Sequence, residues 1–267
     1  MHIVVCVKQV PNPEAAFSMF KVDEGAKKVI PASGLQMVMS PFDEQALEAA
    51  LRIRDAGAQA RITVMTLGTE TARAVLKHGL AMGADDGVLL SDPVFQDGDA
   101  YGTARVLAAA IGKLADCDLV LTGRQAADWD AGVVGCGIAE LMQMPVITFA
   151  RDVRVEEGSV RVERVVENGL DVIEAPLPAV VTVSNELGAA RAPSLRETMR
   201  AARKPVTAWT AADLGLKGDD AGTKAARRIL ERLFVPPKKG ACELVEGATP
   251  EEQGSNLAQR LRQAKLL

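Results

Sequence analysis

Histidine and cysteine are scarce in this chain, and their scarcity argues against histidine-based catalysis and against zinc or iron–sulfur sites. The 267 residues include two histidines, His2 and His78, and neither is expected to be catalytic, because an unpartnered surface histidine is commoner than a general base. The four cysteines lack the spacing of a zinc or iron–sulfur site, and we expect them to be buried as small apolar side chains; they are Cys6, Cys117, Cys136 and Cys242.

Motifs of covalent catalysis and phosphate transfer are missing as well. The chain contains no GxSxG elbow, no HExxH pair and no GxxxxGK[ST] loop. Asp128 and Asp130 resemble part of a metal site or a carboxylate pair, but no third oxygen ligand follows at a suitable spacing. We expect them to cap the next helix and to fix its turn. The sequence therefore predicts no catalytic residue and no metal.

Long apolar runs and a surplus of positive charge are also absent. No stretch approaches the ~20 apolar residues of a membrane span. The amino-terminal MHIVVCVKQVPN lacks the basic lead and the cleavage site of a secretory signal, so the cytoplasm is the expected compartment. A formal net charge of −4 argues against nucleic acid as a partner. The expected partner is a protein or a small molecule.

The chain does contain a regular alternation of apolar, β-branched runs with helical patterns. A helix is predicted over residues 41–56, with Ser40 as its N-cap and Pro41 at its first position. Strand-like segments cover residues 3–8, 61–68, 87–91 and 118–123. This alternation predicts parallel βαβ units, and hence an α/β fold with a Rossmann-like, open and mainly parallel sheet. Ligands of such sheets bind beyond the carboxyl ends of the strands.

The pattern changes after Pro145. Alternating apolar and polar residues, with turn signals at 157–158 and 168–169, predict an antiparallel hairpin element that leads into a final buried strand over residues 179–183. Beyond Leu216 the sequence no longer resembles core, and Pro236 with Pro237 indicates an extended arm that ends in a short amphipathic helix. A disordered tail is the alternative. The predicted division is a nucleotide-binding α/β domain over 1–234 and an arm over 235–267.

The loop GRQAADWDAGVVG, residues 123–135, follows a predicted strand and opens a predicted helix. A glycine-rich turn of this kind exposes backbone N–H groups at a helix N-terminus, where they can hold a phosphate without a cationic side chain. Gly132 and Gly135 would permit the close approach of the ligand, while Val133 and Val134 would contribute backbone groups alone. Together with the loops after the first strand and before the first helix, it could enclose an adenine nucleotide.

Several of these segments resemble the beta subunit of electron transfer flavoprotein. The resemblance rests on VCVKQVPNP, SPFDEQALEAALR, GLAMGADDGVLL, GRQAADWD, VERVVENGLDVIEAPLPAVVTV and RAPSLRETMRAARKP, and so covers most of the chain. Asp171 is a mild departure, because the family usually has Glu or Gln there. The family's signature is otherwise matched by Arg164, Glu167, Asn168, Gly169 and Pro178.

The resemblance implies an electron carrier subunit that is not itself an enzyme. Such a subunit has an adenine-nucleotide alpha-hydrolase-like fold, pairs with an alpha subunit that carries FAD, buries AMP in its own domain, and wraps its arm, here after about Val235, around the partner. Its electrons come from an acyl-CoA-type or other dehydrogenase. The cofactor-binding residues it implies are Cys6, Ser40, Pro41, Phe42, Asp43, Leu67, Gly123, Arg124, Gln125, Ala126, Asp128, Asp130, Gly132, Val133 and Val134.

The segment PSLRETM is similar to the loop with which these subunits reach a dehydrogenase. By resemblance, Leu195 is the apolar anchor, and Arg196 and Arg200 are partner-binding residues. Positive charge on Arg200, Arg203 and Lys204 would steer an acidic partner. The alternative is that Leu195 packs against the first turn of the following helix.

One departure from the family concerns the ligand. AMP-binding members typically read Asn-Gln-Thr-Gly at residues 132–135, so a side-chain amide and a hydroxyl are missing at Val133 and Val134. Val134 before Gly135 is similar to the electron-bifurcating branch, in which a second FAD occupies this pocket and meets NADH. Val133 matches neither branch, which leaves AMP and a second FAD as alternatives. A stand-alone adenine-nucleotide-binding protein, similar to universal stress proteins, is the competing hypothesis, although its glycine-rich phosphate motif is absent.

Overall fold

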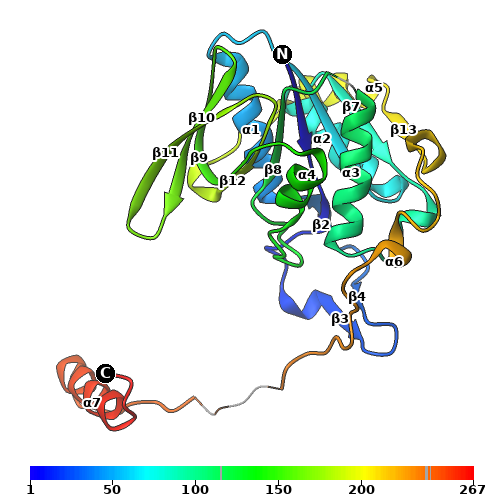
Figure 1. Cartoon of the computed structure of the whole chain (residues 1–267). Helices are drawn as coiled ribbons and strands as arrows, with labels where there is room; N and C mark the ends of the chain where they lie inside the picture. Colours follow the sequence, from blue (N-terminus) through cyan, green and yellow to red (C-terminus); the bar gives the residue numbers. More distant parts are fainter. Residues whose placement is uncertain (115, 238–239, 241) are drawn as a thin grey trace. The chain divides into compact units, whose positions relative to one another are not determined.

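The computed structural model describes residues 1–114, 116–237, 240 and 242–267. The chain divides into two compact units. The first consists of Met1–Lys21 and Val29–Glu231, and the second of Val22–Lys28 and Arg232–Leu267. Figure 1 shows the elements of both, coloured along the sequence.

The first unit is built on a nine-stranded sheet with the order β11-β10-β9-β12-β8-β1-β6-β7-β13. The strands from β12 to β13 in this order are parallel, and the register pairs Cys6 of β1 with both Met65 of β6 and Thr122 of β8. The mainly parallel sheet predicted from the alternating pattern is confirmed. Its parallel strands are β1 (His2–Cys6), β6 (Arg61–Leu67), β7 (Asp86–Leu90), β8 (Leu119–Gly123), β12 (Ala179–Val183) and β13 (Thr207–Trp209).

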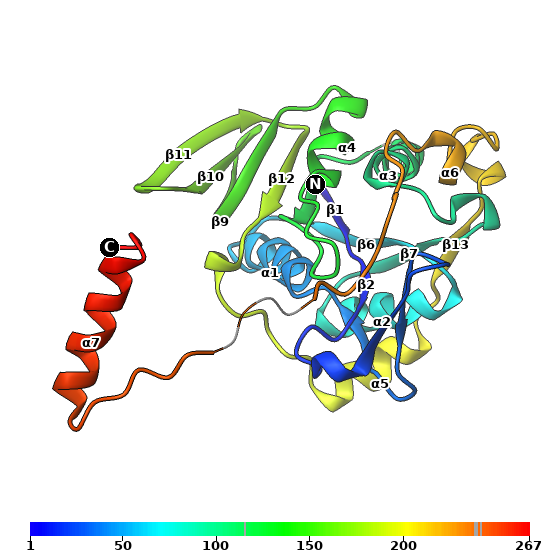
Figure 2. The ribbon, with the colours of Figure 1, turned by 90° about the horizontal axis from the view of Figure 1, so that it is seen from below.

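Helices cover both faces of the parallel part of the sheet (Figure 2). Successive side chains of a strand point to opposite faces. Accordingly, Ile3 and Val5 of β1 belong to one apolar core and Val4 and Cys6 to the other. The first core is completed by α1 (Pro41–Asp55), α2 (Arg73–Met82) and α5 (Leu195–Arg203), and the second by α3 (Ala100–Leu114) and α4 (Val134–Met142).

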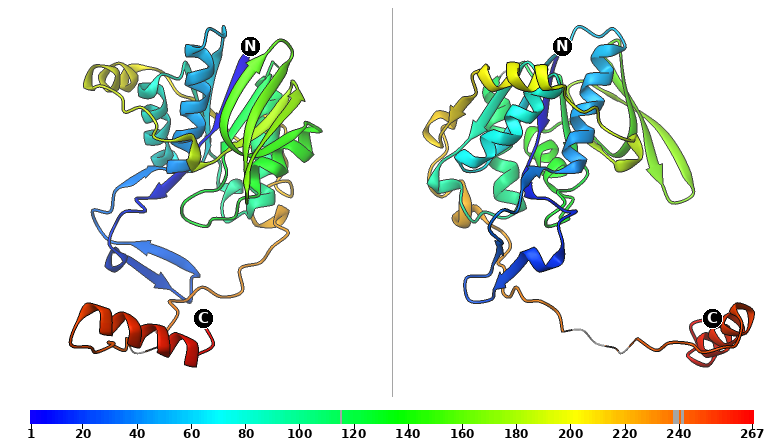
Figure 3. Two further views of the ribbon diagram at one scale, coloured as in Figure 1. Left: turned by 90° about the vertical axis from the view of Figure 1, so that its left-hand side faces the viewer. Right: turned by 180° about the vertical axis from the view of Figure 1, so that it is seen from behind.

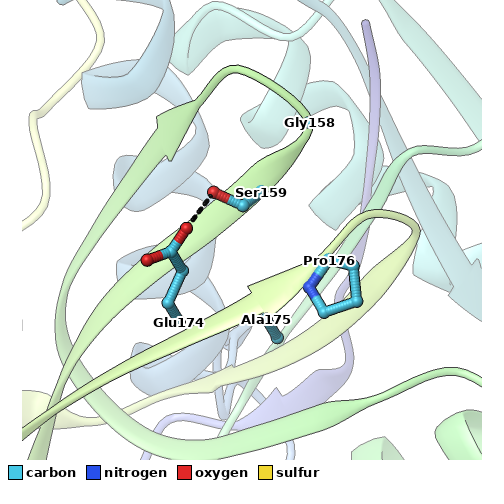
Figure 4. A pocket seen from close by; sticks show the side chains of 5 residues that line it. All are labelled: Gly158, Ser159, Glu174, Ala175 and Pro176. Carbon is cyan, nitrogen blue, oxygen red and sulfur yellow. Dashed lines mark hydrogen bonds between the residues drawn. The ribbon is translucent and has the colours of Figure 1, made fainter.

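The predicted hairpin element is a continuation of the main sheet. β9 (Val146–Glu156) starts parallel to β12 and then pairs antiparallel with β10 (Ser159–Val166), which pairs with β11 (Gly169–Pro176). These strands extend away from the helix-covered part of the sheet (Figure 3). Near their first turn Ser159 donates a hydrogen bond of 2.7 Å to Glu174 in a small hollow (Figure 4). None of the residues lining this hollow is among the predicted cofactor-binding residues.

Short elements complete the description. Two small sheets pair β2 (Gln9–Pro11) with β5 (Met37–Met39) and β3 (Phe20–Asp23) with β4 (Lys28–Pro31). The expectation that the chain leaves the core at Leu216 is wrong, because α6 (Gly222–Ala225) is held against the α3 side of the sheet. There a Cβ on Gly222, whose φ is +59°, would lie 2.2 Å from the Val94 carbonyl oxygen.

The second unit contains α7 (Pro250–Gln263). Thr249 caps its N-terminus by accepting the Glu252 N–H, acidic residues occupy its first turn, and Arg260 and Arg262 lie in its last. The amphipathic helix predicted near the end of the chain is therefore present and begins at Pro250. All its described side chains are at least partly exposed. Positions 238, 239 and 241 of the predicted arm lie outside the described residues.

Candidate functional site

The carboxyl ends of β1 and β8 flank the point where the strand order reverses. From β1 the chain adds β6 and β7 on one side of the sheet, and β8 and β12 on the other. Loops leave neighbouring strands in opposite directions at such a point, which makes it the usual ligand crevice of an open α/β sheet. The predicted nucleotide-binding loops after residues 6 and 123 both start there.

Asp43, in the first turn of α1, ties these two strand ends together. Its Oδ2 accepts the Lys8 N–H at 2.8 Å and its Oδ1 accepts the Gly123 N–H at 3.1 Å. The side chain is buried, with 6% of its surface exposed. Burial raises the pKa of the Asp43 carboxyl to about 7, although both backbone hydrogen bonds and the Lys8 charge act in the opposite direction. The carboxylate therefore holds the site together at a cost in desolvation.

Two glycines bring α1 and α4 into close contact with the ends of the strands. A Cβ on Gly123 would lie 2.6 Å from Asp43 Oδ1 and 2.7 Å from Phe42 Cβ. A Cβ on Gly135 would lie 2.7 Å from Thr122 Oγ1 on β8 and from Thr182 Cγ2 on β12. Both approaches require glycine, so the first turn of α4 lies directly against the carboxyl ends of β8 and β12.

The predicted cradle loop is held in shape by its own side chains. Lys8 Nζ and Asp128 Oδ2 form an ion pair of 2.6 Å, and Gln125 donates to Asp130 at 2.8 Å. Asp130 has a φ of +49°, and Gly132 one of +65°. The expectation that Asp128 and Asp130 fix the turn agrees with these bonds.

Neither aspartate caps α4, which corrects the second part of that expectation. The N-cap position is Val133, which makes no side-chain cap hydrogen bond. Because the first N–H groups of a helix have no partner within it, the start of α4 presents backbone donors that an anion can accept. The described loop therefore has the exposed backbone N–H groups on which the predicted phosphate site depends.

Three other predicted residues lie nearby in different environments. Ser40 is fully buried in the N-cap position of α1, but its hydroxyl does not cap that helix and instead accepts the Ala127 N–H at 3.4 Å. Cys6 and Leu67 face the α3 side of the sheet. Burial raises the pKa of the Cys6 thiol far above its ordinary value, so Cys6 contributes a neutral, apolar wall.

The expectation that all cysteines are buried holds for Cys6 alone. Cys117 and Cys136 are half-buried, and Cys242 is exposed. The histidines have partners in the fold: His2 contacts Asp116 and Thr63, and His78 pairs with Glu44.

Arg124 leaves the cradle and points toward β9 and β12. Its guanidinium lies between the rings of Phe42 and Phe149, at 5.2 and 5.6 Å from their centroids, and Nη1 donates to Ser184 Oγ at 3.4 Å. Its Nε is buried without a hydrogen-bond partner in the described part of the chain. Such an orphaned donor of a cation is typical of a site that a further acceptor completes.

Phe149 was not predicted as a functional residue. It occupies the bulge where the register of β9 against β12 shifts, with a φ of +60° that is unusual for a bulky side chain, and 43% of its surface is exposed. Its N–H donates to Thr182 Oγ1 at 3.2 Å. The sequence carries no signal for this residue, because an aromatic side chain in a strand pattern is ordinary.

The predicted partner-binding residues lie on α5. Ser194 and Glu197 form a capping box that starts the helix, and Lys77 donates to the carbonyl oxygens of Ala201 and Ala202 at its end. The side chain of Leu195 is 78% exposed, so the alternative that it packs against the first turn is wrong.

Met199, one helical turn after Leu195, is 58% exposed and was missed, although the i, i+4 spacing was available as a signal. Arg196 and Arg200 follow the two apolar residues along the same helix. Lys204, in contrast, donates to the Ala84 carbonyl at 2.9 Å and joins α5 to the end of α2. The first turns of α5 therefore expose an apolar pair beside positive charge.

Two kinds of feature are absent from the described residues. Across those ranges, no helix is both long enough and apolar enough to cross a membrane. Within the same part of the chain, no group of three or more His, Cys, Asp or Glu side chains is placed to hold a metal ion.

Comparison with known proteins gives the family. The model of the electron transfer flavoprotein domain matches residues 28–214. The Caffeyl-CoA reductase-Etf complex subunit CarD of Acetobacterium woodii is 38% identical, with all of both chains covered. An electron transfer flavoprotein subunit beta of Megasphaera elsdenii is 38% identical over 95% of this chain and 94% of its own. Protein FixA of Azorhizobium caulinodans is 35% identical over 88% and 85%.

These matches cover nearly the whole chain at a level that defines membership. The chain belongs to the electron transfer flavoprotein family, and its relatives include beta subunits of that flavoprotein and FixA proteins. The family resemblance read from the motifs is confirmed.

Proposed function

We propose that this chain is the beta subunit of a cytoplasmic electron transfer flavoprotein, which passes electrons from a dehydrogenase to an acceptor as half of an alpha–beta heterodimer. It binds an adenine nucleotide beyond the carboxyl ends of β1, β6 and β8, and its arm, from about Val235, packs on the alpha subunit. The observation that carries the nucleotide site is the close packing around Gly123 and Gly135, which brings the uncapped start of α4 against the carboxyl ends of β8 and β12, beside the switch point of the sheet.

Different residues of this chain bind different parts of the nucleotide. Backbone N–H groups at Val134 and Gly135 hold phosphate, Gly132 admits it, and the chain around Cys6 and Leu67 borders the adenine. Asp128 holds Lys8 across the mouth of the site, and Gln125 with Asp130 fixes the loop between them. A flavin, where one is bound, supplies the one- and two-electron chemistry that none of these side chains provides.

The nucleotide is either AMP or a second FAD, and FAD is favoured by Val134, which is similar to the electron-bifurcating branch. The side chains at residues 133 and 134 are both apolar valines, so neither an amide nor a hydroxyl adds to the backbone donors at the start of α4. Arg124, with its orphaned Nε and its two neighbouring rings, offers a cation and aromatic faces beside the site. With a second FAD the complex would bifurcate electrons from NADH.

The dehydrogenase docks on α5. Leu195 and Met199 form an exposed apolar pair, and Arg196 and Arg200 attract an acidic surface. The relative named as a subunit of a caffeyl-CoA reductase complex supports a dehydrogenase that acts on an acyl-CoA-type substrate.

Co-expression with a neighbouring alpha-like gene tests this function. We expect a stable heterodimer with a flavin spectrum, from which acid releases the flavin of the alpha subunit and one further nucleotide. AMP as that nucleotide indicates a simple carrier, and a second FAD indicates bifurcation. A colourless homodimer that binds ATP and ignores the alpha subunit would contradict the proposal and favour the stand-alone nucleotide-binding protein.

A double variant tests why one nucleotide is preferred. V133Q with V134T restores the amide and the hydroxyl that AMP-binding members typically carry. If the two valines favour FAD, the released nucleotide shifts toward AMP in this variant. Unchanged FAD content would mean that other residues select the ligand. Val172→Thr is the control, because it replaces an exposed valine of β11 away from the nucleotide site.

A further inference from the structure

The contacts of Asp43 differ from those of a residue that binds a ligand directly. Both of its oxygens accept backbone N–H groups, one from Lys8 after β1 and one from Gly123 at the end of β8. Eighty residues separate Asp43 from Gly123 in the sequence, so the carboxylate joins three distant segments: the start of α1 and two strand ends. Its 6% exposure leaves little surface for a ligand to touch.

A carboxylate is a costly choice for this place. Burial outweighs the two hydrogen bonds and the Lys8 charge, and the nearby Asp128 charge adds to the unfavourable balance. The other titratable group that faces it, the Cys6 thiol, stays neutral and supplies no compensation. An amide of the same volume would avoid the burial of charge. A buried charge that lowers stability needs a reason in function.

The functional reason is that both backbone groups are connected to the cradle loop. The Lys8 side chain pairs with Asp128, so a shift of the Lys8 backbone moves the cradle loop. Gly123 begins that loop, and its backbone lies in contact with Phe42 and Asp43. One side chain, that of Asp43, therefore fixes the backbone at both Lys8 and Gly123.

We propose that Asp43 is a positioning residue for the adenine nucleotide, which fixes the backbone of Lys8 and Gly123 at the mouth of the site without contacting the ligand. This inference rests on the proposed nucleotide site. It goes further in two ways. One buried carboxylate fixes the distance between the ends of β1 and β8, and Asp43 is separated from the residues that touch phosphate or adenine.

The ionised form is the one that performs this role. A carboxylate has acceptors on both oxygens, whereas a carboxylic acid or an amide directs a hydrogen-bearing group at one of the two N–H donors. D43N thus reproduces the protonated state at every pH. With the pKa of Asp43 near 7, the wild-type chain changes from the acid to the carboxylate between about pH 6 and about pH 8.

The test uses the full chain in its complex with the alpha subunit. Wild type, D43N and the matched control E44Q, which makes the same change in the same helical turn, are compared at about pH 8 and about pH 6. The probe is the nucleotide that wild type releases beyond the flavin of the alpha subunit, either AMP or FAD. Its dissociation constant is measured by equilibrium dialysis, and the thermal midpoint of unfolding is recorded alongside.

We expect D43N to bind the probe about tenfold more weakly than wild type at about pH 8, with the ratio approaching one at about pH 6, where wild type is itself protonated. Comparing variants at one pH cancels the titration of the probe. D43N should at the same time unfold at a higher temperature than wild type at about pH 8, because the desolvation of charge that it relieves outweighs the backbone hydrogen bond that it loses. E44Q should match wild type in binding.

Three results would overturn the inference. Equal affinities of wild type and D43N at both pH values would mean that Asp43 does not position the site. Weaker binding together with a lower unfolding temperature, or a D43N chain that does not fold, would mean that Asp43 is needed for the fold alone. A wild-type complex that releases no second nucleotide would instead contradict the proposed function, so the two failures are distinguishable.

Discussion

Acidic side chains accept backbone N–H groups at both ends of β1, but the free-energy cost of desolvating them differs between the two ends. At the amino end, Asp118 accepts the His2 N–H at 2.7 Å and Asp85 accepts the Ile62 N–H of β6 at 2.8 Å. There the His2 ring bonds to Asp116, and this hydrogen bond lowers the pKa of the Asp116 carboxyl. At the carboxyl end, Asp43 makes the same kind of backbone bonds from a buried position, with a raised pKa.

The difference shows where the fold tolerates an unfavourable group. Solvent solvates the carboxylates of the amino end, whereas Asp43 is surrounded by the start of α1 and two strand ends. Buried Asp43, the positive φ of Asp130 and Phe149, and the orphaned Nε of Arg124 occur on the carboxyl side of the sheet, whereas Gln143, with a φ of +54°, precedes the amino end of β9. Costs of this kind gather at binding sites, because a site needs particular geometry more than it needs stability.

The largest expected effect comes from Gly123→Ala. The added Cβ would lie 2.6 Å from Asp43 Oδ1 and 2.8 Å from the Phe42 carbonyl carbon, so the strand end and α1 must separate. We expect a loss of about 3 kcal/mol in the free energy of unfolding and loss of the nucleotide. Denaturant titration and nucleotide release measure the two effects.

Gly112→Ala is the matched control for that substitution. Gly112 lies in α3 with nothing within 4 Å of an added Cβ, so the variant should gain roughly 1 kcal/mol from helix propensity and keep its nucleotide. A stable G123A chain with full nucleotide content would show that the close packing at the end of β8 is not required.

The pH dependence of stability distinguishes Asp43 from the carboxylates at the amino end of β1. The folded-state pKa of Asp43 is raised above its unfolded value, so its contribution is fully present below about pH 4 and is lost as the pH rises through about 7. D43N should remove this loss and exceed wild type by on the order of 2 kcal/mol at about pH 8. Urea unfolding of both chains across this range tests it, and parallel curves for the two chains would contradict it.

At the amino end, His2→Ala should destabilise without touching function. His2 Nε2 bonds to Thr63 Oγ1 at 2.8 Å, and Thr63 is 1% exposed, so the variant leaves a buried hydroxyl without its partner. We expect a loss of about 2 kcal/mol in the free energy of unfolding, with nucleotide affinity at the wild-type level. A matching fall in nucleotide affinity would mean that the two ends of β1 are not independent.

Leu195→Ala should have the smallest effect on the fold. Its side chain is 78% exposed, so the free energy of unfolding should change by less than about 0.5 kcal/mol and the nucleotide should remain bound. The rate of electron transfer from the dehydrogenase should fall by about tenfold or more, because the anchor of the docking surface is lost. Val172→Ala, which shortens an exposed apolar side chain of β11, is the control, and equal rates for both variants would contradict the assignment of α5.

Local patterns were enough to predict most of the fold. The buried strand over residues 179–183 has the bounds predicted from its apolar run, and α1 begins at Pro41 as expected. Backbone chemistry near a residue fixes such features. Capping by Ser40 and Asp128 was also predicted from local sequence. Their side chains instead bond to Ala127 and Lys8, because tertiary partners compete with capping.

The parts of the site that could not be predicted depend on contacts distant in the sequence. The hydrogen bonds that Asp43 accepts from Lys8 and Gly123 follow from the strand order, which local sequence patterns do not reveal. The φ of Phe149 follows from a register shift between β9 and β12. Arg124 was implied as a cofactor-binding residue by its place in the loop, and packing sets its guanidinium against the rings of Phe42 and Phe149. Position along the chain thus predicted the loops, and packing decided which side chains meet.

A crystal structure of the alpha–beta complex with its native nucleotides would test the proposed nucleotide site most directly. We expect an adenine nucleotide in this chain, with phosphate at the backbone N–H groups of the first turn of α4 and with Asp43 accepting hydrogen bonds from Lys8 and Gly123 behind it. A nucleotide bound elsewhere in this chain, or a carboxyl edge of β1 and β8 filled by side chains of the alpha subunit, would contradict it.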